Sequence, residues 1–439
     1  METLQRTANR GSISTATYEI DNSLKLERAN SENIYRQIID GNRKTWTSSL
    51  WIKRVDTATP SYNLFFNHGI YGVGTYLRFN NDDTLTAAIE SYGGGTSQVT
   101  NAKFRDTSAW MHIVWRVDTT QSTEADRSRI YINGAQITDF SSATYPSQNT
   151  DTLANHDHSG YDDVEFGYKD AGIYSNMYYA DVYHVDGQSL APTEFGEYDS
   201  ASGIWKPIEA DISDFGNNGF YLDFSDASSL GTDSAGNGSF TLSNITSADQ
   251  STDTPTNNFC TLNPLVNFKY TTNGITEGGT VFGDDTGGGV GGAFGTMAVT
   301  AGKWYWEVKL TQQNSHYIGV SAIDDGDNVL SSTDPQEENS TFRFNISAAR
   351  REYVNSGSQG YGSLDEFTDF HSAGDIIGIA LNMDDNQISI YGNGTLQSGV
   401  ANTTLYDAAN KMVVPFHGTI NDEAQYNFGG YSAWTPSSA

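Results

Sequence analysis

The strongest constraint on the fold is a strict alternation of large apolar and polar side chains in the carboxy-terminal half of the chain. Trp304, Trp306 and Val308 fall on one face of an extended segment, and the residues between them carry a charge or a hydroxyl group. A period of two indicates a β-strand that is buried on one face. A short polar connection then leads to a second apolar run at 316–321, which completes a hairpin pattern. Short runs of the same kind, separated by Asn, Asp and Gly turns, recur at 374–381, 387–391 and 412–416.

Six motifs follow one another in this region. They are Gly-Lys-Trp-Tyr-Trp-Glu-Val (302–308), Tyr-Ile-Gly-Val (317–320), Gly-Asp-Ile-Ile-Gly-Ile-Ala (374–380), Ile-Tyr-Gly-Asn-Gly (390–394), Pro415 and Tyr-Asn-Phe-Gly (426–429). In this order they resemble a SPRY domain, and the resemblance covers residues 270–439. It implies a bent two-sheet β-sandwich that binds protein partners through loops and lacks catalytic machinery. Many relatives have an aromatic-Lys-Asn-Gly turn where this chain has Tyr391-Gly-Asn-Gly, so no particular ligand carries over.

The amino-terminal half contains strand patterns of the same type. Residues 46–52 alternate, Trp110-Met-His-Ile-Val-Trp-Arg-Val (110–117) is largely apolar, and Ile-Tyr-Ile-Asn-Gly (130–134) ends in a hairpin turn. Together they resemble a concanavalin A-like jelly roll of the laminin-G type, over residues 18–190. The resemblance implies that Trp110 and His112 belong to the architecture of the sandwich.

Between the two halves, residues 191–265 are rich in turn-forming residues but keep apolar anchors. Phe220, Leu222 and Phe224 alternate, so we expect a strand that joins one of the sandwiches. The sequence therefore predicts an all-β fold of two antiparallel β-sandwiches (jelly-roll, concanavalin A-like) joined by an ordered linker. The expected divisions are a concanavalin A-like domain at 1–190, a connecting region with some strand at 191–265 and a SPRY-like domain at 266–439.

Four segments carry a further resemblance. They are Leu-Gln-Arg-Thr-Ala-Asn-Arg (4–10), Asp-Asn-Ser-Leu-Lys-Leu (21–26), Val-Asp-Gly-Gln-Ser-Leu-Ala-Pro-Thr-Glu-Phe-Gly (185–196) and Asp-Thr-Pro-Thr-Asn-Asn-Phe (253–259). These segments resemble virion structural proteins of tailed bacteriophages. The resemblance implies a location on the virion, at the tail or the capsid surface.

On this basis we expect a non-enzymatic structural or adhesion protein. The leading interpretation is a tail-fibre or tail-associated protein that recognises a host-surface glycan or protein. The alternative is a capsid decoration or head-fibre protein, and a polysaccharide-degrading enzyme is a third class. The expected partners are other virion proteins, the host-surface glycan or protein, and further copies of this chain in a homo-oligomer.

The composition argues against two kinds of partner. The 54 acidic and 24 basic residues give a formal net charge of −30, whereas nucleic-acid binding requires clustered Lys and Arg. The same charge disfavours anionic membrane surfaces. No apolar run approaches the ~20 residues that cross a bilayer, so we expect no membrane insertion. A single cysteine, Cys260, rules out a disulfide within the chain and is expected to be a packed residue.

Candidate ligand contacts are tyrosines in or near glycine-rich loops, because aromatic faces on loops can stack on a glycan or a protein partner. The candidates are Tyr71, Tyr92, Tyr161, Tyr174, Tyr178 and Tyr179. The sequence does not distinguish such contacts from tyrosines that pack in the core.

Metal and catalytic sites are less well supported by the sequence. We expect no cofactor but leave calcium open, because acidic loops offer hard oxygen ligands, although none has EF-hand spacing. The candidate ligands are Asp82, Asp83, Asp162, Asp163, Asp324, Asp325 and Asp327. Glycoside hydrolysis requires two carboxylates that flank the scissile bond. The nearest pattern, Glu-Ala-Asp-Ile-Ser-Asp at 209–214, lies outside the expected sandwich strands, so we expect no enzymatic activity.

Overall fold

The structure is a computed structural model, and its chain divides into two compact units. Among the described residues, the first unit extends from 18 to 258 and the second from 259 to 434. The residues described are 18–57, 62–68, 74–157, 163–169, 173–267, 275–283, 290–312, 315–323, 341–355, 358–363, 366–368, 372–405, 412–420, 423–430 and 434.

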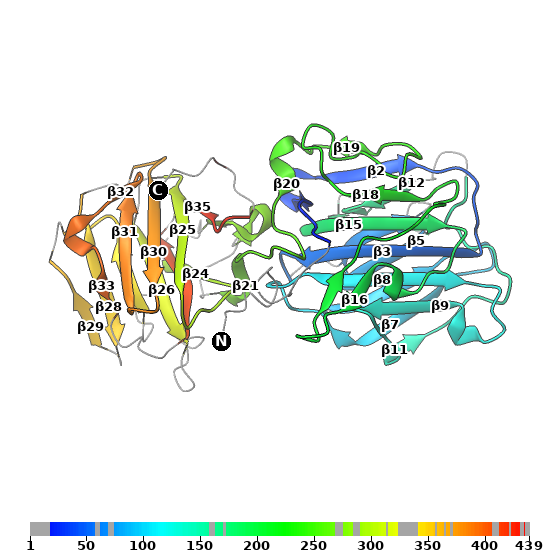
Figure 1. The fold of residues 1–439 in the computed structure, drawn as a ribbon, viewed down its shortest axis with the longest axis horizontal. Helices are drawn as coiled ribbons and strands as arrows, with labels where there is room; N and C mark the ends of the chain where they lie inside the picture. Colours follow the sequence, from blue (N-terminus) through cyan, green and yellow to red (C-terminus); the bar gives the residue numbers. More distant parts are fainter. Residues whose placement is uncertain are drawn as a thin grey trace. The chain divides into compact units, whose positions relative to one another are not determined.

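The first unit contains two eight-stranded antiparallel sheets among its described residues (Figure 1). One sheet has the order β10-β9-β8-β3-β15-β1-β20, and β18 also pairs with β15. Its strands are β10 (Ala135–Gln136), β9 (Ser128–Ile132), β8 (Met111–Asp118), β3 (Thr45–Arg54), β15 (Met177–Asp186), β1 (Ser23–Leu26), β20 (Gln250–Ser251) and β18 (Phe220–Leu222).

The other sheet has the order β11-β7-β6-β5-β4-β12-β2-β19. Its strands are β11 (Phe140–Ala143), β7 (Thr96–Lys103), β6 (Thr84–Ile89), β5 (Thr75–Asn80), β4 (Tyr62–His68), β12 (Asp163–Phe166), β2 (Asn33–Gln37) and β19 (Thr241–Ser243). Side chains of both sheets form one core, in which Trp46 and Trp115 meet edge to face at 4.9 Å. Two short pairs, β13 (Tyr168–Lys169) with β14 (Ile173–Tyr174) and β16 (Gly196–Tyr198) with β17 (Trp205–Pro207), complete the unit.

The predicted connecting region largely belongs to this first unit. Its residues up to Asn258 supply β18, which pairs with β15, β19, which pairs with β2, and β20, which pairs with β1. Apolar residues of 190–221 also pack on Val114, Tyr131 and Tyr183, on the outer side of the first sheet. As a result every residue of β15 is buried, although a sandwich strand ordinarily exposes one face.

Three buried ion pairs attach this region to the strands of the amino-terminal half. They are Lys25–Asp249 at 3.0 Å, Arg36–Asp233 at 3.0 Å and Lys53–Asp253 at 2.7 Å. Buried charges are tolerated only when they are paired and hydrogen-bonded. The buried charges of these three cations are therefore neutralised by carboxylates that residues 233–253 supply.

The second unit is also a pair of antiparallel sheets (Figure 1). The described part of one sheet has seven strands: β21 (Leu262–Asn267), β24 (Val290–Gly295), β34 (Met412–Ile420), β26 (Ser315–Ile323), β27 (Thr341–Asn345), β28 (Arg350–Asn355) and β29 (Ser358–Tyr361). The described part of the other has eight: β22 (Ile275–Thr276), β23 (Val281–Gly283), β35 (Glu423–Asn427), β25 (Lys303–Leu310), β30 (Ile376–Asn382), β31 (Gln387–Gly392), β32 (Thr395–Leu396) and β33 (Thr403–Thr404).

The predicted alternation of β25 is visible in its packing. Trp306 and Val308 enter the core of the second unit, whereas the hydroxyl of Tyr305 donates a hydrogen bond to Glu307 on the opposite face. The prediction of an all-β fold with two antiparallel sandwiches is therefore confirmed.

The described helices are single 3₁₀ turns: η1 (Arg28–Asn30), η2 (Glu124–Asp126), η3 (Pro192–Glu194), η4 (Ser247–Asp249), η5 (Glu277–Gly279) and η6 (Ser398–Val400). No helix within the described ranges has the length and apolar character needed to span a membrane.

Candidate functional site

Tyr92 is the most exposed of the predicted ligand-contacting tyrosines that the structure describes. It lies in the turn between β6 and β7, and 66% of its surface is accessible. Its hydroxyl is 2.9 Å from Nε2 of His156, and the two rings meet edge to face. With this exposure, and with its ring and hydroxyl both in contact with His156, Tyr92 is the central aromatic side chain of the candidate contact surface.

Two other loops bring charged groups to Tyr92. The guanidinium carbon of Arg43 lies 5.6 Å from the centre of the Tyr92 ring, at cation–π distance. Arg43 Nε donates to the carbonyl of Thr152 at 2.7 Å, while its Nη2 is buried and has no hydrogen-bond partner in the part of the chain that the structure describes. The guanidinium is therefore anchored by the Thr152 carbonyl and places its charge beside the Tyr92 ring. We call Asp40, Arg43, Tyr92 and His156 the Tyr92 rim.

The fourth member, Asp40, orients the histidine. His156 Nδ1 lies 2.9 Å from Asp40 Oδ1, and because an ionised carboxylate only accepts, Nδ1 carries the proton. In the neutral form of the ring, Nε2 then accepts the hydroxyl proton of Tyr92. The bonds from His156 and from the Asp157 amide hold the pKa of the Asp40 carboxyl below its usual value.

The turn that presents Tyr92 has a conformation that its glycines permit. Gly94 has a φ of +114°, and its amide donates to the carbonyl of Ser91 at 3.1 Å. The Ser91 hydroxyl donates back to the Gly94 carbonyl at 2.9 Å. A β-carbon on Gly95 would lie 2.3 Å from Glu90 Oε1, so a larger residue there would require the Glu90 carboxylate to move. These contacts fix the turn in a conformation that leaves the tyrosine ring outward.

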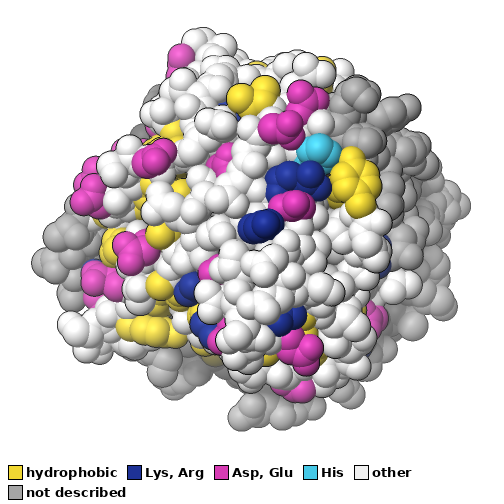
Figure 2. Space-filling model, turned by 90° about the vertical axis from the view of Figure 1, so that its right-hand side faces the viewer, with side chains coloured by type: hydrophobic (Ala, Val, Ile, Leu, Met, Phe, Trp, Pro, Cys, Tyr) yellow, Lys and Arg dark blue, Asp and Glu magenta, His cyan; other side chains and the backbone are white. Residues whose placement is uncertain are grey.

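Figure 2 shows the corresponding mixture of side chains on one face of the molecule. Lysine and arginine side chains lie beside a histidine, a hydrophobic side chain and an acidic side chain. An aromatic face with flanking charged donors and acceptors suits a saccharide, whose ring faces are apolar and whose edges carry hydroxyl groups. Such a surface supplies aromatic and charged groups for binding.

The structure does not place the other predicted tyrosines on this rim. Tyr71 and Tyr161 lie outside the described residues. Tyr174 is half-buried and packs on Tyr168 at 4.9 Å, with its carbonyl accepting a bond from Arg28 Nε. Tyr178 and Tyr179 are fully buried, which corrects the prediction that they contact a ligand. Both faces of their strand are covered, by the second sheet on one side and by outer segments on the other.

Of the predicted calcium ligands, only three lie among the described residues. Asp82 is exposed and accepts from the amide and hydroxyl of Thr84, which lowers its pKa. Asp83 is engaged by Arg54 and Arg105, at 3.1 and 2.9 Å. Asp163 is half-buried at the start of β12. Within the described residues no three His, Cys, Asp or Glu side chains converge as a metal site would require. The remaining candidates, Asp162, Asp324, Asp325 and Asp327, lie outside them.

The carboxylates of the hydrolase-like pattern lie in an irregular segment of the chain. Glu209, Asp211 and Asp214 are exposed, while Ala210 and Ile212 between them pack on the first unit. His112 is fully buried as predicted: Trp205 Nε1 donates to its Nδ1 at 2.9 Å, and its Nε2 is 2.8 Å from Ser49 Oγ. Burial lowers the pKa of His112 to about 3, so the ring is neutral and structural.

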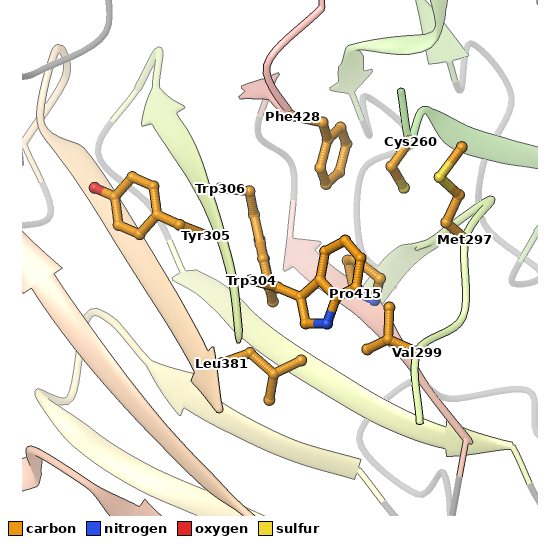
Figure 3. A pocket seen from close by; sticks show the side chains of 9 residues that line it. All are labelled: Cys260, Met297, Val299, Trp304, Tyr305, Trp306, Leu381, Pro415 and Phe428. Carbon is orange, nitrogen blue, oxygen red and sulfur yellow. The ribbon is translucent and has the colours of Figure 1, made fainter. Parts of the chain in front are cut away.

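The second unit contains a small apolar pocket of about 50 Å³ (Figure 3). Trp304, Phe428 and Met297 face it, and Cys260 lies at its wall, whereas Tyr305 points away from the others in this view. The indole nitrogen of Trp304 donates to the carbonyl of Ala301 at 2.9 Å, which leaves the pocket lining apolar. The space is far below the ~300 Å³ of a small-molecule site, and at most one aliphatic side chain would fill it.

Family models match two segments of the chain, one in each unit. Residues 29–174 match the Concanavalin A-like lectin/glucanases superfamily, and residues 303–431 match the SPRY domain. The chain carries a concanavalin A-like domain and a SPRY domain. The Tyr92 rim lies within the concanavalin A-like match, and the apolar pocket combines residues of the SPRY match with Cys260, Met297 and Val299 before it. No curated protein sequence matches the chain significantly.

Several solved structures have similar folds at low identity. Domains LG4-5 of the mouse laminin alpha1 chain are 8% identical, with 96% of this chain and 97% of that chain covered and a TM-score of 0.34. The SPRY domain of human HERC1 is 16% identical, with 40% and 99% covered and a TM-score of 0.28. A putative carbohydrate binding protein from Bacteroides ovatus is 14% identical, with 51% and 58% covered and a TM-score of 0.37. All three TM-scores are below 0.5, so these similarities do not indicate a ligand for this chain.

The sequence did not identify three of the four rim residues. Asp40, Arg43 and His156 lie in loops separated from Tyr92 by about fifty residues or more, and no local motif marks them. In the sequence these residues are marked only as polar or charged residues beside strand ends. Most loops of this acidic chain have such residues, so the pattern does not single them out.

Proposed function

We propose that this chain is a non-enzymatic adhesion protein that binds a host-surface glycan or protein through the Tyr92 rim. We further propose that it belongs to the virion of a tailed bacteriophage, in a tail fibre or associated with the tail. The observation that carries the binding proposal is Tyr92, two-thirds exposed on a fixed turn and flanked by Arg43 and His156. The superfamily matched by this domain includes lectins by name, which supports a saccharide as ligand.

Support for the virion assignment comes from the four sequence segments that resemble virion structural proteins. A particle presents many copies of a surface protein, and we propose that this chain acts as a homo-oligomer attached to other virion proteins. Modest affinity at each rim would then sum to tight attachment through the raised effective concentration of linked copies. Neither nucleic acid nor membrane insertion has a part in the proposal.

A glycan array tests the binding proposal. The full chain should bind a defined set of glycans, and Tyr92→Ala should lower the affinity at least about tenfold, as expected for a central aromatic contact. Tyr198→Ala is the matched control, because Tyr198 is 54% exposed in the same unit and its hydroxyl bonds to the carbonyl of Asn133, away from the rim. Equal losses in both variants would refute the assignment of the rim.

Immunogold labelling of intact particles separates the leading interpretation from its alternative. Label at the tail is the expected result. Label spread over the head would favour a capsid decoration or head-fibre protein. Absence of label from exposed particles would refute the virion assignment.

The enzyme alternative has its own test, because the superfamily name also includes glucanases. We expect no release of reducing sugars from polysaccharides that the chain binds. Release that disappears in Glu209→Gln would establish hydrolysis and reject the non-enzymatic proposal.

A further inference from the structure

The first unit has a second cavity, of about 260 Å³, that is separate from the Tyr92 rim. Its walls come from the end of β3, the connection between β7 and β8, and the turn between β9 and β10. The rim flanks the beginning of β3 at Arg43, whereas the cavity includes Arg54 at its end. At ~3.3 Å per residue the two sites lie at opposite ends of the sandwich, about 30 Å apart.

Three cations and one carboxylate line this cavity. The cations are Arg54, Lys103 and Arg105, and the carboxylate is Asp106. One carboxylate oxygen of Asp106 is already hydrogen-bonded within the chain. Its Oδ1 accepts from the amide of Ser108 at 2.8 Å and from the hydroxyl of Ser108 at 2.5 Å. In a chain with a net charge of −30, a cavity wall with more cations than acids stands out.

Asp83 lies behind the wall and compensates part of this charge. Its Oδ1 is 3.1 Å from Arg54 Nη2 and its Oδ2 is 2.9 Å from Arg105 Nε. Arg54 is buried, so it serves mainly to hold Asp83 and, through Nη1, the carbonyl of Phe104. Arg105 is different: its side chain is 54% exposed and its Nη groups make no hydrogen bond to any residue that the structure describes.

Two further donors are available at the cavity. The Lys103 side chain is exposed and forms no ion pair or hydrogen bond within the described ranges, and its charge helps to lower the pKa of the exposed Asp82 carboxyl. Asn133 accepts the amide of His112 with Oδ1 at 2.8 Å, which directs its side chain, and its Nδ2 has no partner in the described part of the chain. Phe104 and Trp110 add aromatic surface between these donors.

We infer that this cavity is a second binding site, for a saccharide that carries a carboxylate group. The guanidinium of Arg105 and the ammonium of Lys103 would hold the carboxylate, because ionised donor–acceptor pairs form the stronger hydrogen bonds. The Asn133 amide would bond to a ring hydroxyl, and the aromatic wall would pack on the apolar face of the sugar ring. The cavity lies slightly below the ~300–1,000 Å³ of drug-sized sites, which suits a single acidic sugar residue.

Titration calorimetry of the full chain tests this inference, with a galacturonic acid trisaccharide as the probe and its methyl ester as the uncharged comparison. The acid should bind saturably, and the ester should bind at least about tenfold more weakly. Lys103→Gln and Arg105→Gln should each weaken binding of the acid about tenfold. Lys303→Gln, which removes an equal charge from an exposed position in the other unit, should leave it unchanged.

Two comparisons keep this result separate from the function of the rim. Tyr92→Ala should leave binding of the acidic trisaccharide unchanged, so a loss there would assign that binding to the rim and overturn the inference. Inorganic phosphate tests a general anion site, and phosphate binding as tight as that of the trisaccharide would also overturn it. Equal affinity for the ester, full affinity in both cavity variants or the absence of saturable binding would do the same.

Discussion

Replacing Asp253 with alanine should destabilise the first unit strongly. The carboxylate is almost completely buried, with Oδ2 2.7 Å from Lys53 Nζ and Oδ1 accepting from Trp110 Nε1 at 2.8 Å. Alanine would remove the ionised partner of the buried ammonium group, which keeps the amide oxygen of Asn258 as an acceptor at 2.8 Å. Removing one partner of a buried pair costs about 3–5 kcal/mol of unfolding free energy. For a unit of this size that corresponds to a fall in Tm of roughly 6–20 °C.

Differential scanning calorimetry of the full chain is the suitable assay, because a transition of the second unit provides an internal reference. Asp211→Ala is the matched control: this carboxylate is exposed in the same region, and its loss should leave the transition in place. The double variant Lys53→Met with Asp253→Leu should recover part of the lost stability, since apolar residues replace a buried pair at little cost while the Trp110 N–H loses its acceptor. A loss below about 1 kcal/mol in Asp253→Ala would refute the reasoning that residues 233–253 neutralise the sheet surface.

Three further predictions follow from other contacts. Gly134→Ala should lower the free energy of unfolding by roughly 1–3 kcal/mol in a denaturant titration, because φ is +78° and a β-carbon would lie 2.3 Å from Trp205 Cζ3. Gly203→Ala is the control: φ is +72° there but the space around it is open, so the loss should be smaller. Equal losses in the two variants would contradict the steric argument. Asp181 is fully buried, and burial raises its pKa from 3.8 to about 6; its contribution to stability is therefore complete below about pH 4 and is lost as the pH rises through 6. Between about pH 4 and pH 6 the free energy of unfolding should fall by about 3 kcal/mol because of this group, and Asp181→Asn should abolish that fall. The same slope of unfolding free energy against pH in the variant would contradict the assignment to Asp181. If calcium binds in the acidic loop at Asp324–Asp327, then adding it should raise Tm in a thermal-shift assay and a chelator should reverse the rise, whereas identical melting in both conditions would reject the site.

The strands of this fold could be predicted because each one is determined largely by its own residues. The alternation in 303–310 matches β25, and the run at 387–391 matches β31 to within one residue. Burial on one face and exposure on the other leaves a local pattern in the sequence. The fold class follows from many such short strands and their turns.

The burial of β15 could not be predicted in the same way. Tyr178 and Tyr179 point to opposite faces of a strand, so a sandwich with one open face would expose one of them. The structure covers both faces, in part with apolar residues of 190–221 that pack on the outer side of the sheet. Nor does the local sequence reveal that Lys53 is buried, because its partner Asp253 is 200 residues away.

The candidate site was predictable only in part, for the same reason. Tyr92 could be chosen because it precedes three glycines in a turn, which favours exposure. Its contacts with Arg43 and His156 arise from the meeting of three loops at the end of the sandwich. The sequence shows which residue types each loop contains. It does not show which loops lie next to one another in the folded chain.

The most direct test of the adhesion proposal is the attachment of the fluorescently labelled chain to intact cells of the proposed bacterial host. The wild-type chain should label the cells, with Tyr92→Ala reducing the label at least about tenfold and Tyr198→Ala retaining it. Absence of labelling by the wild-type chain, or full labelling by Tyr92→Ala, would contradict the account.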